Sequence, residues 1–136
     1  MKKLPEIGHY DVEVFEQEGH LIETWSQNGV HHRIGGPAVT YYDKDTGKAV
    51  IQVYKQNGIV HRDNGPAHIQ IHPTNDIVFI EEYYQQGELH RVGKPARIRN
   101  NIHGGERMNS EYYQLGERIT SKGKTMDESY RPRFPM

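Results

Sequence analysis

The architecture follows from one stretch, Gly58-Ile-Val-His61-Arg62-Asp-Asn-Gly65-Pro66-Ala67, because its pattern occurs again one fixed step before it and one fixed step after it. The earlier copy runs from Gly29 to Ala38 and the later copy from Gly87 to Ala96, so matching glycines are 29 residues apart. A weaker fourth copy begins at Gly116. Self-similarity at a constant period predicts one supersecondary unit per copy, with each unit packing on its neighbours.

Each full unit contains signals for three strands. In the second unit, Ala49 to Gln56 is rich in β-branched and aromatic residues, and Asn57-Gly58 is a strong signal for a two-residue type I′ hairpin. Ile59 to Arg62 is then the expected return strand. After a second turn, Ala67 to His72 alternates isoleucine with polar residues, which predicts a third strand.

We therefore predict an all-β fold, an antiparallel meander of β-hairpin repeats that forms one elongated, twisted sheet. No window of useful length has apolar residues at helical spacing, and glycine or proline interrupts the chain too often for a helix of normal length. The expected organisation is a flexible N-terminus over residues 1–9, a single β-repeat domain over 10–120 and a flexible tail over 121–136. Within the domain we expect a truncated cap over 10–20, full repeats from about 21, 50 and 79, and a partial repeat from about 108.

Superposing the copies predicts the core as columns of matching residues. The columns are Leu21, Val50, Phe79 and Met108; Ile22, Ile51 and Ile80; Trp25, Tyr54, Tyr83 and Tyr112; Ala38, Ala67 and Ala96; and Thr40, Ile69 and Ile98. The first and third columns have one parity along the strands and the second has the other, so both faces of the sheet are expected to carry large side chains. Because monomers rarely expose such a stripe, we expect a homo-oligomer, as an antiparallel dimer, or a protein partner.

Composition excludes several classes of protein. The 136 residues include no cysteine, which rules out a disulfide framework and a thiolate metal site. No apolar run approaches membrane-spanning length, and no apolar segment follows Lys2 and Lys3, so we expect a cytoplasmic protein with no membrane contact. The first 90 residues contain 7 Lys/Arg and 13 Asp/Glu, whereas the last 46 contain 10 and 5, so the two ends differ in sign.

The repeated glycine, histidine, arginine and proline are interpreted as structural positions, since a catalytic residue need occur only once. They are Gly29, His32, Arg33 and Pro37; Gly58, His61, Arg62 and Pro66; and Gly87, His90, Arg91 and Pro95. The histidine is expected to hydrogen-bond turn carbonyls. The arginine is expected to lie over the aromatic column or to pair with acidic neighbours such as Glu23 or Glu81.

No catalytic, cofactor or metal site is predicted. His32, His61 and His90 form one column, whose neighbours are roughly 10 to 14 Å apart if each unit contributes two or three strands. Two nitrogens on one zinc must lie within roughly 3.5 Å of each other. Ser26 and Ser110 have no His/Asp partner that would indicate a nucleophile, so we expect a protein that is not an enzyme.

The basic residues Lys94, Arg97, Arg99 and Arg107 are the candidates for contact with a partner or a nucleic acid. Arg97 and Arg99 share one strand face, and tyrosines that stack bases are available nearby. The rest of the sheet is acidic and opposes a nucleic-acid backbone, so a solvated strand face is the favoured interpretation.

The string Tyr-x-x-x-Gly-x-x-His-Arg-x-x-Gly-Pro-Ala resembles tandem repeats in proteins of tailed bacteriophages, giant viruses and some bacteria, and is loosely similar to MORN-type hairpin repeats. The resemblance covers Leu21 to roughly Thr120, departs at Lys94, where glycine is expected, and carries no catalytic residue onto this chain. It implies a non-enzymatic protein-binding scaffold, such as a phage accessory protein that binds and modulates a host protein in the host cytoplasm. The alternative is a nucleic-acid-binding protein that uses the basic C-terminal third, and the third hypothesis is a small-ligand binder or weak enzyme.

Overall fold

The computed structural model describes residues 9–123, and over that range it contains strands and turns but no helix. The main sheet has ten strands in the order β1-β2-β4-β5-β8-β9-β12-β13-β14, with β3 pairing beside β2, and its neighbours are antiparallel. This confirms the predicted antiparallel meander. The strands are β1 (Asp11–Gln17), β2 (His20–Gln27), β3 (Val30–His31), β4 (Val39–Asp43), β5 (Ala49–Val53), β6 (Lys55–Gln56), β7 (Ile59–Val60), β8 (His68–Ile71), β9 (Val78–Glu82), β10 (Tyr84–Gln85), β11 (Glu88–Leu89), β12 (Arg97–Asn100), β13 (Arg107–Gln114) and β14 (Glu117–Ile119).

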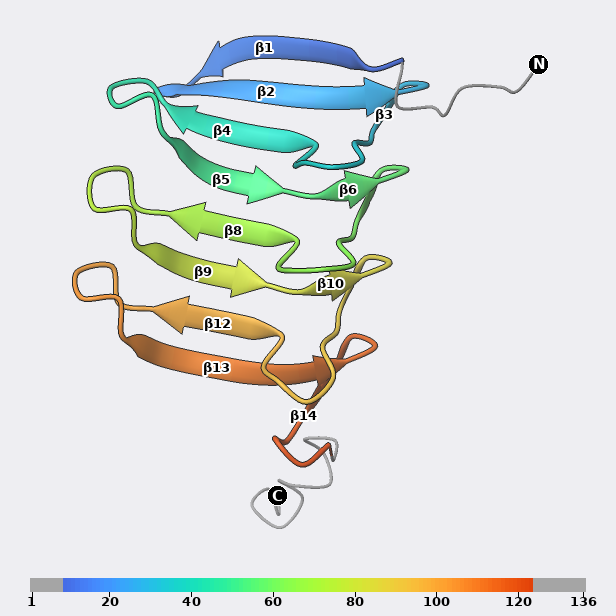
Figure 1. The fold of residues 1–136 in the computed structure, drawn as a ribbon, viewed down its shortest axis with the longest axis vertical. Coiled ribbons are helices and arrows are strands. Elements are labelled where there is room, and N and C mark those ends of the chain that lie inside the picture. Colours follow the sequence, from blue (N-terminus) through green and yellow to red (C-terminus); the bar gives the residue numbers. More distant parts are fainter. Residues whose placement is uncertain (1–8, 124–136) are drawn as a thin grey trace, which may run out of the picture.

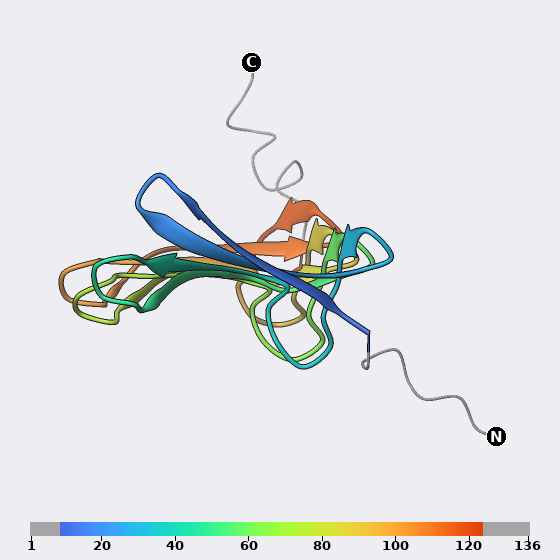
Figure 2. The ribbon, with the colours of Figure 1, turned by 90° about the horizontal axis from the view of Figure 1, so that it is seen from above.

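The units are stacked along the long axis of the molecule, and each one places a short hairpin beside the main sheet (Figure 1). In the view along the stack, the sheet forms one layer, and the side hairpins and the loops that follow them diverge from one end of it (Figure 2). Equivalent hairpins and loops of successive units therefore follow one another along the stack.

The return strands of the second and third units, β7 and β11, lie outside the main sheet, whereas β3 and β14 remain paired within it. In the described residues, β7 pairs with β6 and β11 pairs with β10, while β5 pairs directly with β8. Each unit therefore advances the main sheet by two strands, which is one of the two alternatives that the sequence leaves open. The chain leaves the sheet at Tyr54, whose N–H donates to the carbonyl of Ala67 and whose carbonyl accepts from the N–H of His61.

The two-residue hairpin turns contain consecutive residues with positive φ. At Asn57 and Gly58 the φ angles are 53° and 81°, as a type I′ turn requires. The same pattern occurs at Glu18-Gly19, Asn28-Gly29, Gln86-Gly87 and Leu115-Gly116. Glu, Gln and Leu adopt this conformation at a cost, so the stacking of the units holds turns that local sequence alone does not favour.

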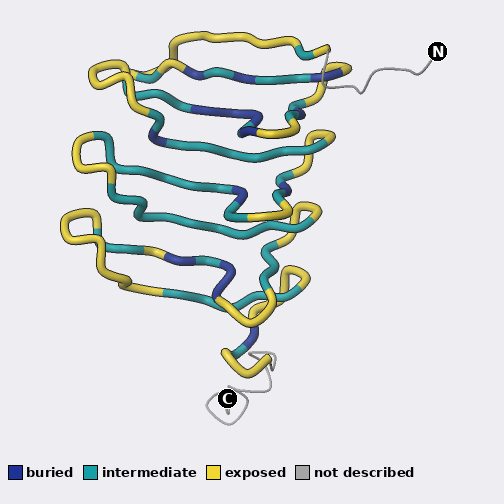
Figure 3. Tube along the Cα trace, in the orientation of Figure 1, coloured by how far each residue is buried: buried dark blue, intermediate teal, exposed yellow. Residues whose placement is uncertain are grey.

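Buried residues gather where the main sheet meets the loops (Figure 3). The alanine column is confirmed as core, because Ala38, Ala67 and Ala96 are each 0 % exposed. The other columns are mixed: Ile22, Thr40, Val50 and Ile98 are buried, and the four aromatic residues, Ile51, Ile69, Phe79 and Ile80 are half-buried.

Leu21 and Met108 are wrong core predictions, since they are 39 % and 62 % exposed. Both lie near an end of the stack, where the adjacent strand is itself exposed or does not extend as far as the residue. Beside Leu21 is the edge strand β1, which is exposed along its whole length. Beside Met108, the outer edge of β13 pairs with β14 only from Tyr112 onward.

The two ends of the sheet differ in the length of their last strand. The predicted N-terminal cap forms β1, which pairs with β2 from Asp11 opposite Ser26 to Gln17 opposite His20. At the other end, β14 finishes at Ile119 and a turn follows. Of the two predicted flexible segments, 1–9 and 121–136, residues 1–8 and 124–136 lie outside the described residues.

Candidate binding clefts

Each histidine of the repeated His-Arg pair joins its own unit to the next one. In all three units the ring Nδ1 accepts a hydrogen bond from a backbone N–H in the turn of the following side hairpin. The pairs are Asn57 to His32 at 2.9 Å, Gln86 to His61 at 3.0 Å and Leu115 to His90 at 3.0 Å. The expectation of turn carbonyls as partners is therefore wrong, because the ring reaches the N–H of the next turn instead.

Because Nδ1 accepts a hydrogen bond, the tautomer of these rings is defined. A neutral imidazole accepts through one nitrogen and donates through the other, so the ring proton lies on Nε2. In the second unit Nε2 is 2.8 Å from Oδ1 of Asp63, which accepts that proton's hydrogen bond. The rings of His32 and His61 are 5 % and 6 % exposed, whereas the turns and the Asp63 carboxylate that they contact are exposed, so each bond lies at the boundary between the core and solvent.

Backbone hydrogen bonds run parallel to the histidine bonds and stack the side hairpins. From Gly58 onward, the N–H of the turn glycine donates to a carbonyl in the preceding hairpin. The N–H of each stacked arginine donates to a carbonyl in the following hairpin. The glycine bonds are Gly58 to His31 at 2.8 Å, Gly87 to Val60 at 2.8 Å and Gly116 to Leu89 at 2.9 Å. The two residues of each turn therefore both donate to the preceding unit, one to a histidine ring and the glycine to a carbonyl, and these bonds fix successive hairpins relative to one another.

The arginine column lies over the aromatic column, as one of the two sequence-based alternatives predicted. The distances from Cζ to the ring centroid are 3.6 Å for Arg33 over Trp25, 3.9 Å for Arg62 over Tyr54 and 3.8 Å for Arg91 over Tyr83. Nη1 of each arginine also donates to the carbonyl of the proline four residues later, at 3.2, 3.0 and 3.1 Å. Two contacts therefore hold every guanidinium in one place.

The glycine before the proline leaves room for the guanidinium in the first two units. A Cβ at Gly36 would lie 2.8 Å from Cζ of Arg33, and one at Gly65 would lie 2.9 Å from Cζ of Arg62. In the third unit Lys94 occupies this position, yet Arg91 keeps both its ring contact and its proline contact. The substitution therefore leaves the arginine in place and adds an exposed ammonium.

The other expected role of these arginines, pairing with Glu23 or Glu81, is not observed. Those two carboxylates accept from the hydroxyls of Tyr42 and Tyr83, each at 3.4 Å. Within residues 9–123, no carboxylate lies within ion-pair distance of the three stacked guanidiniums. Their positive charge is therefore not neutralised by a salt bridge in that part of the chain.

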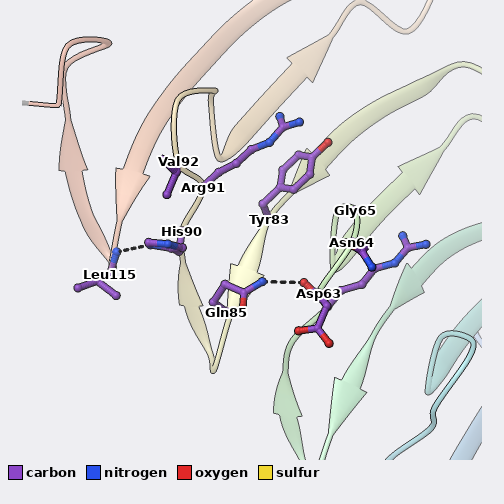
Figure 4. A pocket seen from close by; sticks show the side chains of 10 residues that line it. Asp63, Asn64, Gly65, Tyr83, Gln85, His90, Arg91, Val92 and Leu115 are labelled. Carbon is purple, nitrogen blue, oxygen red and sulfur yellow. Dashed lines mark hydrogen bonds between the residues drawn. The ribbon is translucent and has the colours of Figure 1, made fainter.

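Two open clefts between successive units repeat with the 29-residue period. The first, of about 320 Å³, is lined by Arg33, Tyr54, Gln56, His61 and Arg62, among others. The second, of about 500 Å³, is lined by the equivalent residues Arg62, Tyr83, Gln85, His90 and Arg91 (Figure 4). Arg62 lines both clefts, so the two form one continuous row on the loop side of the stack.

The electrostatics of the second cleft show the influence of both of its arginines. Burial raises the pKa of the Tyr83 hydroxyl, and the charge of Glu81 raises it further. The charges of Arg91 and Arg62 act in the opposite direction and favour the phenolate. Burial and Glu81 outweigh the two arginines at the Tyr83 hydroxyl, so its pKa is raised overall, although each guanidinium by itself favours a negative group nearby.

The basic residues favoured by the sequence do not form one cationic patch. Arg97 on β12 lies between two carboxylates, with Nε 2.8 Å from Glu82 and Nη1 3.3 Å from Glu111. Lys94 is exposed in the preceding loop, whereas Arg99 and Arg107 are exposed near the turn that joins β12 to β13. Arg97 is thus neutralised, and Lys94 lies in a different loop from Arg99 and Arg107, which are neighbours on the paired strands β12 and β13.

Glu82 completes the network around Arg97. Its Oε1 is 2.8 Å from Nδ1 of His68, and the Tyr84 hydroxyl donates to the same oxygen at 3.4 Å. The hydrogen bond from His68 lowers the pKa of Glu82 against the opposing effect of burial, and the Arg97 charge lowers it as well. This cluster is internally compensated, which distinguishes it from the clefts.

Within the described part of the chain, no three His, Asp or Glu side chains are grouped so that they could hold a metal ion. Over the same residues, there is no helix of the length and apolar character needed to cross a membrane. Comparisons with protein-family models, with curated proteins and with solved structures found no match to this chain. The clefts must therefore be interpreted from their own chemistry.

Proposed function

We propose that the protein is a non-enzymatic scaffold that binds another protein along the row of clefts. The observation that carries the proposal is the recurrence of one cleft in successive units, with an arginine, an aromatic ring, a glutamine and a histidine at equivalent positions. A catalytic site requires one convergent set of groups, whereas a surface that repeats along a stack suits a partner that extends along it.

The clefts have the chemical character of an interface. Arginine and aromatic residues are enriched at the energetically important centres of protein interfaces. Each guanidinium is held over its ring and bonded to a proline carbonyl, so little side-chain freedom remains to be lost on binding. The clefts therefore favour binding through preorganisation rather than through area alone.

The biological setting is part of the same proposal. The repeat pattern resembles those of phage and viral proteins, which supports an accessory protein that binds and modulates a host protein. The exposed apolar residues Val12, Val14 and Phe15, which are 46 %, 60 % and 44 % exposed on the edge strand β1, support self-association as well. Light scattering at several protein and salt concentrations tests the dimer, and a monomeric mass at tens of micromolar contradicts it.

Affinity capture from a host lysate, with and without nuclease, tests the proposed function. We expect a stoichiometric protein that is retained after nuclease treatment. Loss of all captured material on nuclease treatment would favour the nucleic-acid alternative, and capture of nothing in either arm would contradict binding. Capture with Arg99→Ala, which alters an exposed arginine outside the clefts, is the matched control and should recover the same protein.

A further inference from the structure

We infer that the row of clefts binds an acidic peptide in the polyproline II conformation, with a carboxylate at every third residue. This inference rests on the proposed function, because it names the chemistry of the partner at the same clefts. It follows from the spacing of Arg33, Arg62 and Arg91, from the charge of the clefts and from the way the three guanidiniums are held.

The spacing of the arginines selects the conformation of the ligand. Equivalent residues of successive units are two strands apart, which corresponds to about 9.6 Å at 4.8 Å per strand. A polyproline II helix has three residues per turn and rises about 3.1 Å per residue, so every third side chain recurs on the same side after about 9.3 Å. In a β-strand, by contrast, residues three apart point to opposite sides.

The charge of the row selects the chemistry of the ligand. The charged residues that line the two clefts or lie in their loops are Arg33, Arg62, Asp63, Arg91 and Lys94, which gives four cations and one anion. Asp63 accepts from Nε2 of His61, so its charge is partly engaged. Planar guanidiniums with free donor positions match carboxylates, and each one has only one protein hydrogen bond among the described residues.

A nucleic-acid backbone fits the row less well than a peptide does. Duplex DNA carries one negative charge per about 3.4 Å along each strand, roughly three times the charge density that the arginines present. The aromatic rings are also covered by the guanidiniums at 3.6 to 3.9 Å, so bases cannot stack directly on those faces. Carboxylates at intervals of about 9 Å match the arginines one to one.

The test uses the whole protein and a labelled peptide of four Glu-Pro-Pro triplets, with binding followed by fluorescence anisotropy. The matched peptide has the same composition and charge, but its glutamates are clustered at one end. We expect the spaced peptide to bind at least ten times more tightly than the clustered one, and more weakly as salt is raised. Equal affinity of the two peptides, or no binding of either, would overturn the inference.

Arg62→Ala is the informative variant, because Arg62 lines both clefts. It should weaken binding of the spaced peptide at least tenfold, whereas Arg99→Ala should change it less than twofold. Because Arg62 also packs on Tyr54, the unaltered protein supplies a second measurement that needs no variant. The Nε–H resonances of Arg33, Arg62 and Arg91 should shift on titration, and shifts confined to Arg99 and Arg107 would contradict the cleft assignment.

A labelled oligouridylate of twelve nucleotides is titrated in parallel. Binding that is tighter than that of the spaced peptide and is lost in Arg62→Ala would assign the clefts to nucleic acid and overturn the peptide inference. Failure of this inference is distinguishable from failure of the proposed function. A nuclease-resistant protein that the unaltered chain captures from lysate and Arg62→Ala does not, although neither peptide binds, would support the scaffold and remove the acidic-peptide partner.

Discussion

His61→Ala should destabilise the protein, because it breaks a bond between two units. The substitution removes the Nδ1 acceptor of the Gln86 N–H and the Nε2 donor to Asp63, at a site where the ring is 6 % exposed. A net hydrogen bond contributes about 0.5 to 1.5 kcal/mol, and a buried polar group left unpaired costs about 1 to 3 kcal/mol. Gln86 lies in an exposed turn, where water can replace the ring, so we expect a loss of about 1 to 3 kcal/mol in total.

Urea denaturation followed by circular dichroism measures this loss. With a slope of roughly 1 to 3 kcal/mol per molar urea, the midpoint should fall by roughly 1 M. His61→Asn is the matched variant, because its Oδ1 is attached to Cγ as Nδ1 is and can accept the same N–H. His90→Ala should cost less than His61→Ala, since His90 is half-buried and the bond it accepts is exposed. An unchanged midpoint for His61→Ala, or no recovery with His61→Asn, would refute the assigned role of Nδ1.

Three other substitutions test the remaining parts of the structure. Gln86→Asn should stabilise the fold by about 0.5 to 1 kcal/mol, because φ is 49° at this position and asparagine tolerates it better, while Asn57→Gln should cost a similar amount in the same urea assay. Ala67→Val should cost about 1 to 3 kcal/mol through overpacking at a site that is 0 % exposed, whereas Ala49→Val at a half-buried position should be nearly neutral in thermal melts. Because the pKa of Glu82 lies below its ordinary value of 4.5 when the protein is folded, its contribution is present above pH 4.5 and is lost as the pH falls through the lowered pKa. Glu82→Gln should therefore flatten the acid limb of a stability-against-pH curve, and an unchanged acid limb would contradict the His68 and Arg97 contacts.

The parts of the fold that depend on local chemistry could be predicted from the sequence. Asn57-Gly58 specifies its turn by conformational preference alone, and the period then places the equivalent turns. Alternation along the strands assigns the columns to faces, because side chains in a strand alternate regardless of what packs on them. The stacking of Arg62 on Tyr54 could also be anticipated, since both residues recur together in every unit.

The parts that depend on how neighbouring units sit together could not be predicted. The acceptor role of His61 requires the turn of the next unit to lie beside the ring, 25 residues away along the chain. The exposure of Leu21 and Met108 depends on where the sheet ends, which a column of matching residues does not reveal. The clefts cannot be predicted for the same reason: repetition of the arginines indicates scaffold positions, and nothing in the sequence shows that Arg97 is neutralised by Glu82 and Glu111.

The clefts depend on the histidine of each full unit, which accepts a hydrogen bond from the turn of the next unit. Nuclear magnetic resonance on uniformly ¹⁵N-labelled protein tests it most directly, through scalar coupling across the hydrogen bond between the amide nitrogen and the imidazole Nδ1. We predict couplings from Asn57 to His32, from Gln86 to His61 and from Leu115 to His90, together with Nδ1 shifts typical of an unprotonated nitrogen. Rings that carry their proton on Nδ1, or amides at these turns that exchange with water as freely as those of an open loop, would contradict it.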